Sequence, residues 1–274
     1  QQNKQVSLPY EPATHHTSQP LELVHSDLCG PITPASKGGA KYIATFLDDY
    51  TKFSVIRLLK RKSDMAAVMP EVFNFLERQC NGNFSVKALR TDNGTEYVND
   101  EVTLYLNNNG IVHQTSNPYT PQQNGKAERL NKTMMEKTRA MLNGADLPPE
   151  MWGESVVTAN MLRNRSPATG IKVTPYEMFH GRRPNVSFLR PYGIAAFALI
   201  PKQRRTTKLD EVSVEGKLVG YELEGSGYRL LLSDGTICSS RNVVFSTPAS
   251  GTPATDAAAV VVVATRVPPR QVSF

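Results

Sequence analysis

The sequence of 274 residues predicts an α/β domain followed by a smaller all-β domain. Three short segments rich in β-forming residues come first, and helical and strand-like segments then alternate, which is typical of a mixed α/β layer architecture. From about Phe188 the pattern changes to short strand-like segments between glycine-rich or charged turns, which is typical of a small β-barrel. We therefore predict a linker at 1–20, an α/β domain at 21–185, a barrel at 186–246 and a disordered tail at 247–274.

The first half of the α/β domain is expected to be a strand meander followed by a helix. Apolar side chains from Met65 to Leu76 form one helical stripe, although Pro70 disturbs its first turns. A further strand, a short helix, another strand and a loop rich in Pro, Gln, Asn and Gly come next. The predicted strands are 21–28, 42–47, 53–59, 86–90 and 111–115, the short helix is 101–106 and the loop is 117–125.

Two helices are predicted after this loop. In 123–143, the residues Ala127, Leu130, Met134, Thr138 and Met141 recur at steps of three and four, as on an amphipathic helix. In 152–163, Trp152 is expected to anchor the core. The predicted strands of the barrel are 194–200, 216–221, 228–232, 236–240 and 243–245.

The composition restricts the function classes. Lys and Arg number 31 against 25 Asp and Glu, and this net charge of +6 favours a polyanionic partner, although a solvated basic surface is an equally good explanation. Three cysteines without a Cys-x-x-Cys pair indicate neither a disulfide framework nor a zinc site. The longest apolar tract, 257–264, is about ten residues short of a membrane span, so we expect no membrane partner.

Three acidic residues form the candidate site. Asp27 is expected to end the first strand, Asp92 to end the fourth at an Asn-Gly turn, and Glu128 to lie on a face of the long helix. The spacing of Asp92 and Glu128 is weak evidence alone, because about half of one such pair is expected by chance and a second pair, Asp100 and Glu136, is present. Asp100 is better explained as a charge at a helix N-terminus.

Carboxylates in this arrangement suit a metal-dependent phosphoryl transfer. Neighbouring strands lie about 4.8 Å apart, so Asp27 and Asp92 could share one cation. Three carboxylates in one cleft repel one another unless a cation compensates, and Mg²⁺ prefers oxygen ligands. Two such ions about 3.5 to 4 Å apart can activate an attacking oxygen and stabilise a leaving one on a phosphodiester.

Other polar residues are weaker candidates. Lys132 and Arg139 project from the same side of the helix as Glu128 and could contact a DNA backbone, or they could form an ordinary solvated face. We interpret Asp48-Asp49 as a hairpin turn, His15-His16 as exposed linker residues and His113 as a packed or surface histidine.

Three segments carry a resemblance to a known family. They are His25-Ser26-Asp27-Leu28-Cys29-Gly30-Pro31, Arg90-Thr91-Asp92-Asn93-Gly94-Thr95-Glu96-Tyr97, and Tyr119-Thr120-Pro121-Gln122-Gln123-Asn124-Gly125-Lys126-Ala127-Glu128-Arg129. Together they closely resemble the integrase of Ty1/copia-type LTR retrotransposons, and the resemblance extends from about Leu21 to Phe245.

The resemblance implies an RNase H-like catalytic core in which Asp27, Asp92 and Glu128 bind two Mg²⁺ or Mn²⁺ ions. It implies that water first trims the 3′ ends of the element's DNA, and that each 3′ hydroxyl then attacks host DNA. It also implies a product of a Gag-Pol polyprotein that acts as a homo-multimer with other Gag-Pol products, first in a cytoplasmic particle and then in the nucleus.

The same resemblance implies where DNA binds and how the chain ends are organised. The implied DNA contacts are Tyr119, Gln123, Asn124, Lys126, Arg129, Lys132 and Arg139. The segments 184–190, 216–221 and 241–245 resemble the family's C-terminal part, whose fold is expected to be SH3-like. Residues 1–5 resemble the segment just after the family's zinc-binding domain, so we expect that domain to precede Gln1. We expect residues 1–274 themselves to bind no zinc.

Two alternatives remain open at this point. A protein with the same fold could be an RNase H-like nuclease that only hydrolyses, or the chain could be a DNA-binding remnant without catalysis.

Overall fold

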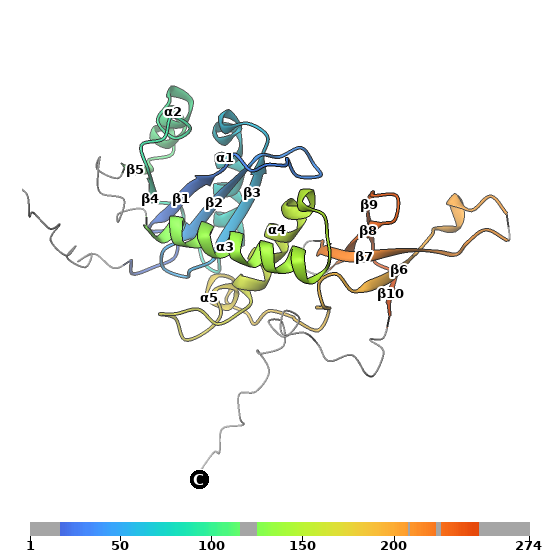
Figure 1. The fold of residues 1–274 in the computed structure, drawn as a ribbon. Coiled ribbons are helices and arrows are strands. Elements are labelled where there is room, and N and C mark those ends of the chain that lie inside the picture. Colours follow the sequence, from blue (N-terminus) through green and yellow to red (C-terminus); the bar gives the residue numbers. More distant parts are fainter. Residues whose placement is uncertain (1–16, 116–124, 208, 223–225, 247–274) are drawn as a thin grey trace, which may run out of the picture.

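A mixed five-stranded sheet forms the centre of the first domain (Figure 1). The computed structural model describes residues 17–115, 125–207, 209–222 and 226–246. Strands β1 to β3 pair antiparallel, and β4 and β5 continue the sheet parallel to β1, in the order β3-β2-β1-β4-β5. Their bounds are β1 Val24–Cys29, β2 Tyr42–Asp48, β3 Ser54–Leu59, β4 Ala88–Thr91 and β5 Val112–Thr115. The predicted meander and mixed sheet are confirmed.

Helices cover both faces of this sheet. Strand β2 shows why, because Ala44 and Phe46 point into one core while Ile43 and Leu47 point into the other. The first core is closed by α1 (Met65–Gln79), α2 (Asp100–Asn108) and α5 (Pro175–His180), and the second by α3 (Gly125–Gly144) and α4 (Trp152–Asn164). The described ranges also contain the short 3₁₀ helices η1 (Lys62–Asp64), η3 (Pro149–Met151) and η4 (Lys202–Arg204). None of the helices within the described ranges has the length and apolar character needed to cross a membrane.

Helix α5 was not predicted from the sequence. The Thr174 side chain accepts a hydrogen bond from the Glu177 amide at 3.1 Å, and Pro175 occupies the first turn. Gly181 ends the helix with a φ of 68°, a left-handed conformation that favours glycine. The helix is only six residues long, yet its Phe179 ring stacks on Phe53 with centroids 4.2 Å apart.

A second five-stranded sheet follows, in the order β10-β6-β7-β8-β9. Its strands are β6 Ala195–Leu199, β7 Ser213–Tyr221, β8 Tyr228–Leu232, β9 Ile237–Ser240 and β10 Val243–Phe245. All five were predicted, although β7 begins three residues earlier than expected. The buried side chains of Ala196, Ala198, Leu218 and Leu230 form its small core. Within the described residues β9 and β10 do not pair, so the barrel is open along this seam.

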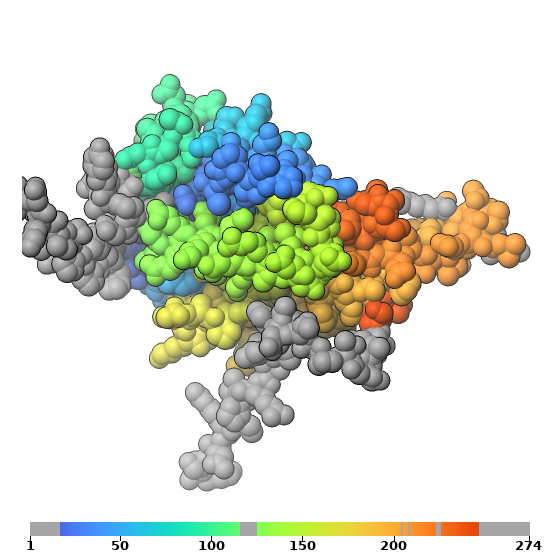
Figure 2. Space-filling model, in the orientation of Figure 1, coloured from blue at the N-terminus to red at the C-terminus, as the bar shows by residue number. Residues whose placement is uncertain are grey.

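Helix α4 joins the two parts. The Arg229 guanidinium on β8 donates to both carboxylate oxygens of Glu154 on α4, at 2.8 and 2.7 Å. Thr158 Oγ1 donates to the Val219 carbonyl oxygen at 3.3 Å, and Lys217 Nζ donates to the Ala145 carbonyl oxygen at 3.0 Å. In Figure 2 the green surface of α3 and α4 adjoins the orange surface of the second domain. One part of this orange surface projects away from the rest of the molecule.

Candidate active site

Asp27 lies on β1, and Asp92 directly follows the neighbouring parallel strand β4. His25 on β1 pairs with Arg90 on β4, so continuing this register by two residues brings Asp27 level with Asp92. Asp92 follows the last residue of β4, and one of its carboxylate oxygens accepts the Gly94 amide at 3.0 Å. The sheet alone therefore brings together two acids that are far apart in sequence.

The third carboxylate, Glu128, lies in the first turn of α3 and is exposed. Helix α3 packs on β1 and β2 through Leu130 and Met134, which places its N-terminal turn over Asp27. Asn131, one turn after Glu128, donates from Nδ2 to Asp27 Oδ2 at 2.8 Å. We did not predict this contact, although a buried Asn on the inner side of an amphipathic helix, 7% exposed here, is a signal for a specific polar partner.

The charges of Asp92 and Glu128 act on the Asp27 carboxyl group. Burial raises the pKa of Asp27 above its usual value, the hydrogen bond from Asn131 opposes this, and the negative charges of Asp92 and Glu128 raise the pKa further. Among the described residues, however, no group of three His, Cys, Asp or Glu side chains is close enough to hold one ion. The side chains face a common region, but they do not form a closed ligand set.

A buried tyrosine and a fourth acid lie close to this region. The Tyr97 hydroxyl is 2.8 Å from Ser26 Oγ, beside Asp27. Burial raises the pKa of Tyr97 well above its usual value, and Asp27, Asp92 and Glu96 raise it further despite the hydrogen bond with Ser26. The phenol therefore stays protonated and neutral beneath the carboxylates. The Arg90 to Tyr97 segment contains both residues, but its local pattern held no sign that they would face Asp27.

The predicted DNA contacts fall into two groups. Arg129, Lys132 and Arg139 are exposed on α3. Lys126 is half exposed, but its ammonium group pairs with Asp49. Tyr119, Gln123 and Asn124 lie outside the described residues. Whether any of these residues binds DNA stays a prediction.

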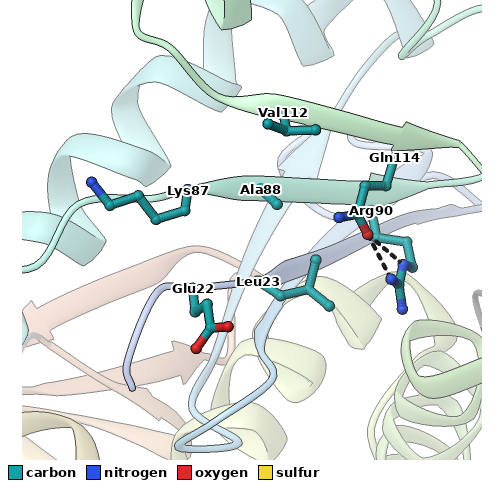
Figure 3. A pocket seen from close by; sticks show the side chains of 7 residues that line it. All are labelled: Glu22, Leu23, Lys87, Ala88, Arg90, Val112 and Gln114. Atoms are coloured by element: carbon teal, nitrogen blue, oxygen red, sulfur yellow. Dashed lines mark hydrogen bonds between the residues drawn. The ribbon is translucent and has the colours of Figure 1, made fainter. Parts of the chain in front are cut away.

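An open cavity of about 410 Å³ extends along β4 and β5 (Figure 3), and none of Asp27, Asp92 and Glu128 lines it. Arg90, which points to the same side of the sheet as His25, donates from Nε and a terminal nitrogen to Gln114 Oε1 at 3.1 and 2.5 Å. This pairing joins β4 to the neighbouring strand β5. The other lining residues are Glu22, Leu23, Lys87, Ala88 and Val112.

The alternative candidates behave as ordinary structural residues. Asp48 caps the β2-β3 turn by accepting hydrogen bonds from the amide and hydroxyl of Thr51 and from the Leu21 amide, as expected for a hairpin turn. His113 Nε2 lies 2.9 Å from Thr91 Oγ1, and burial lowers its pKa. His15-His16 lies outside the described residues.

Comparison with known families agrees with both parts of this architecture. The integrase core domain family matches residues 17–121, a range that contains Asp27 and Asp92 and ends before Glu128. The retroviral polymerase SH3-like domain family matches residues 194–256, which include the second sheet. The fold and the two matches thus define an RNase H-like integrase core followed by an SH3-like domain.

Retrotransposon polyproteins match between 64% and 89% of the chain. The chain is 40% identical over 83% of its length to the retrovirus-related Pol polyprotein from transposon TNT 1-94 of Nicotiana tabacum, and 30% identical over 89% to that from transposon RE1 of Arabidopsis thaliana. It is 27% identical over 64% to the transposon Ty1-NL2 Gag-Pol polyprotein of Saccharomyces cerevisiae. It spans 17%, 16% and 10% of these three relatives. The chain belongs to the integrases of Ty1/copia-type retrotransposons.

A solved structure supports the fold across both domains. A chain in the cryo-EM structure of the simian T-cell lymphotropic virus intasome, in complex with PP2A regulatory subunit B56 gamma, aligns with a TM-score of 0.51 and 17% identity. The alignment covers 86% of this chain and 83% of that one. At this identity the likeness concerns the fold alone.

Proposed function

We propose that this chain is the catalytic part of an integrase that trims the 3′ ends of element DNA and joins them to host DNA. The observation that carries the proposal is the convergence of β1, the end of β4 and the start of α3 near Asp27, which follows from the β1-β4 register and from the hydrogen bond that Asn131 donates to Asp27. The proposed enzyme works as a homo-multimer on DNA, with other Gag-Pol products in a cytoplasmic particle and then in the nucleus.

The residues fit a divalent cation. Asp27 is partly buried and feels the negative charges of Asp92 and Glu128, so its own ionised form is poorly compensated by solvent. Asn131 Oδ1 is buried nearby and has no hydrogen-bond partner in the described part of the chain. We assign Asp27, Asp92 and Glu128 as ligands of Mg²⁺ or Mn²⁺, two ions for each site, which would supply Lewis-acid stabilisation of phosphodiester oxygens.

The protein's own groups have distinct roles in this proposal. Asn131 orients the Asp27 carboxylate, because its amide holds one of the two oxygens and leaves the other available. Arg129, Lys132 and Arg139 contact DNA phosphates, which fixes the position of the duplex without reading its sequence. Tyr119, Gln123 and Asn124 approach the end of the element DNA, and Lys126 contributes where its pairing with Asp49 permits.

A DNA-joining assay tests the proposal. The protein is mixed with a labelled element end, a target duplex and Mg²⁺, both alone and with the expected zinc-binding domain added before Gln1. We expect joined products from the longer protein. Cleavage without joining would indicate a nuclease that only hydrolyses, and DNA binding without either product would indicate a non-catalytic remnant.

Asp27→Asn is expected to raise the thermal unfolding midpoint in EDTA at neutral pH. The folded-state pKa of Asp27 is raised, so its stabilising contribution is present below the unfolded pKa and is lost as the pH rises through the folded pKa. At neutral pH the ionised carboxylate therefore costs stability, and the neutral amide does not.

The same melting experiment includes added Mg²⁺. Mg²⁺ should raise the midpoint of the unchanged protein, because a ligand that binds only the folded state stabilises it, and should raise that of the variant much less. Asp64→Asn, which changes a partly exposed acid at the N-cap of α1, is the control that keeps the Mg²⁺ response. An Asp27 variant with a lower midpoint in EDTA would contradict the argument.

A further inference from the structure

Asp49 collects contacts from three separate parts of the first domain. It lies in the turn between β2 and β3 and is only 4% exposed. Its Oδ1 accepts a hydrogen bond from His25 Nε2 at 3.2 Å and pairs with Lys52 Nζ at 3.4 Å. The ammonium group of Lys126 pairs with the same oxygen, and Thr17 Oγ1 donates to Oδ2 at 3.1 Å.

Two of these partners adjoin the proposed metal ligands. His25 precedes Asp27 by two residues on β1, and Lys126 precedes Glu128 by two residues on α3. A single buried carboxylate thus connects the strand that carries Asp27 with the helical turn that carries Glu128.

The pairing of Lys126 with Asp49 also offsets a local electrostatic cost. A lysine in the first turn of a helix meets the positive end of the helix dipole, which is unfavourable without a nearby anion. Burial alone would raise the pKa of Asp49, but the hydrogen bonds from His25 and Lys126 and the charge of Lys52 lower it far below its usual range. Asp49 is therefore an anion at neutral pH, and it holds the first turn of α3 through the Lys126 ammonium group.

We propose that Asp49 is a positioning residue that sets the separation between Asp27 and Glu128. The inference rests on the proposed metal site and adds to it a residue that does not touch the metal. Without the Asp49 anion, the first turn of α3 is free to move away from β1, while Leu130 and Met134 still anchor the rest of the helix. The expected defect is a looser metal site on a folded protein.

The test is Mn²⁺ binding by the full chain without DNA, followed by electron paramagnetic resonance. Asp49→Asn and Lys126→Met should each raise the Mn²⁺ dissociation constant about 10-fold, as changes behind metal ligands commonly do. The Mn²⁺ dissociation constant of the double variant should be no higher than that of the more affected single variant, because both changes break the same contact. Lys52→Met is the matched control: it removes a cation from Asp49 without touching α3, and should bind Mn²⁺ normally.

Hydrogen exchange of the α3 amides separates the positioning role from the metal site itself. Asp49→Asn and Lys126→Met should speed exchange in the first turn of α3 and leave the turn around Met134 protected, whereas Lys52→Met should change neither. If both variants bind Mn²⁺ as tightly as the unchanged protein, or exchange in the first turn at its rate, the positioning role is wrong. If the unchanged protein binds no Mn²⁺, the proposed function fails, and the exchange rates alone still decide whether Asp49 holds α3.

Discussion

Glu128→Gln is expected to abolish the joining of a labelled DNA end to a target duplex, by more than about 100-fold, while DNA binding stays within about twofold. Changes behind metal ligands often cost 10- to 100-fold, and the loss of a ligand's charge should cost more. Glu128 is exposed on α3 and makes no core contact, so the amide should not unfold the protein. Gel-resolved joined products and a parallel binding titration measure the two effects.

A matched control lies on the same helix. Glu136 is also exposed on α3, two turns further on, and Glu136→Gln makes the same chemical change away from Asp27. It should leave joining nearly unchanged, whereas Asp92→Asn should match the loss seen with Glu128→Gln. Joining that survives either Asp92→Asn or Glu128→Gln would remove those residues from the proposed ligand set.

Trp152→Ala is expected to lower the free energy of unfolding by about 3 to 5 kcal/mol, the usual range for a buried aromatic residue replaced by alanine. Trp152, the first residue of α4, is 3% exposed and packs in the core that α3 and α4 form with the sheet. Its indole Nε1 also donates to the Pro34 carbonyl oxygen at 2.9 Å, which would lose its partner. Urea unfolding followed by circular dichroism gives the difference.

Two further variants separate packing from hydrogen bonding. Trp152→Phe keeps most of the apolar volume and loses the indole donor, so it should cost about 1 to 3 kcal/mol. Val157→Ala, on the same helix but 44% exposed, should change stability by less than about 0.5 kcal/mol. Equal losses for Trp152→Ala and Val157→Ala would show that Trp152 is not a core anchor.

The sequence predicted the elements whose periodicity is strong. The helix that carries Glu128, the strand that carries Asp27 and the strand before Asp92 follow directly from apolar spacing and turn residues, although β1 continues two residues past Asp27, which was expected to end it. Helix α5 was missed because its six residues are too few to show a helical repeat of apolar positions, although Thr174, Pro175 and Gly181 mark both of its ends. Thr174-Pro175 before a short apolar run was thus an available signal.

Contacts between distant segments were beyond sequence reasoning. Asn131 meets Asp27, and Asp49 meets Lys126, only because α3 crosses β1 at one particular height and angle. Nothing in the local pattern of either segment encodes that crossing, since it depends on how Leu130 and Met134 fit between strands. Strand ends, turn residues and helical spacing predicted the three acids, the resemblance to known integrases gave them their implied roles, and the structure supplied the residues around them.

The Arg229 to Glu154 pairing has a consequence for assembly. Turning the SH3-like domain away from the core would separate Arg229 from Glu154, which form a partly dehydrated ion pair. It would also expose Val219, which is fully buried at this junction. The orientation of the SH3-like domain relative to the core is therefore fixed before any copy of the chain enters a complex. Less orientational entropy would then be lost on association, so a modest contact area would suffice in the multimer on DNA that we propose.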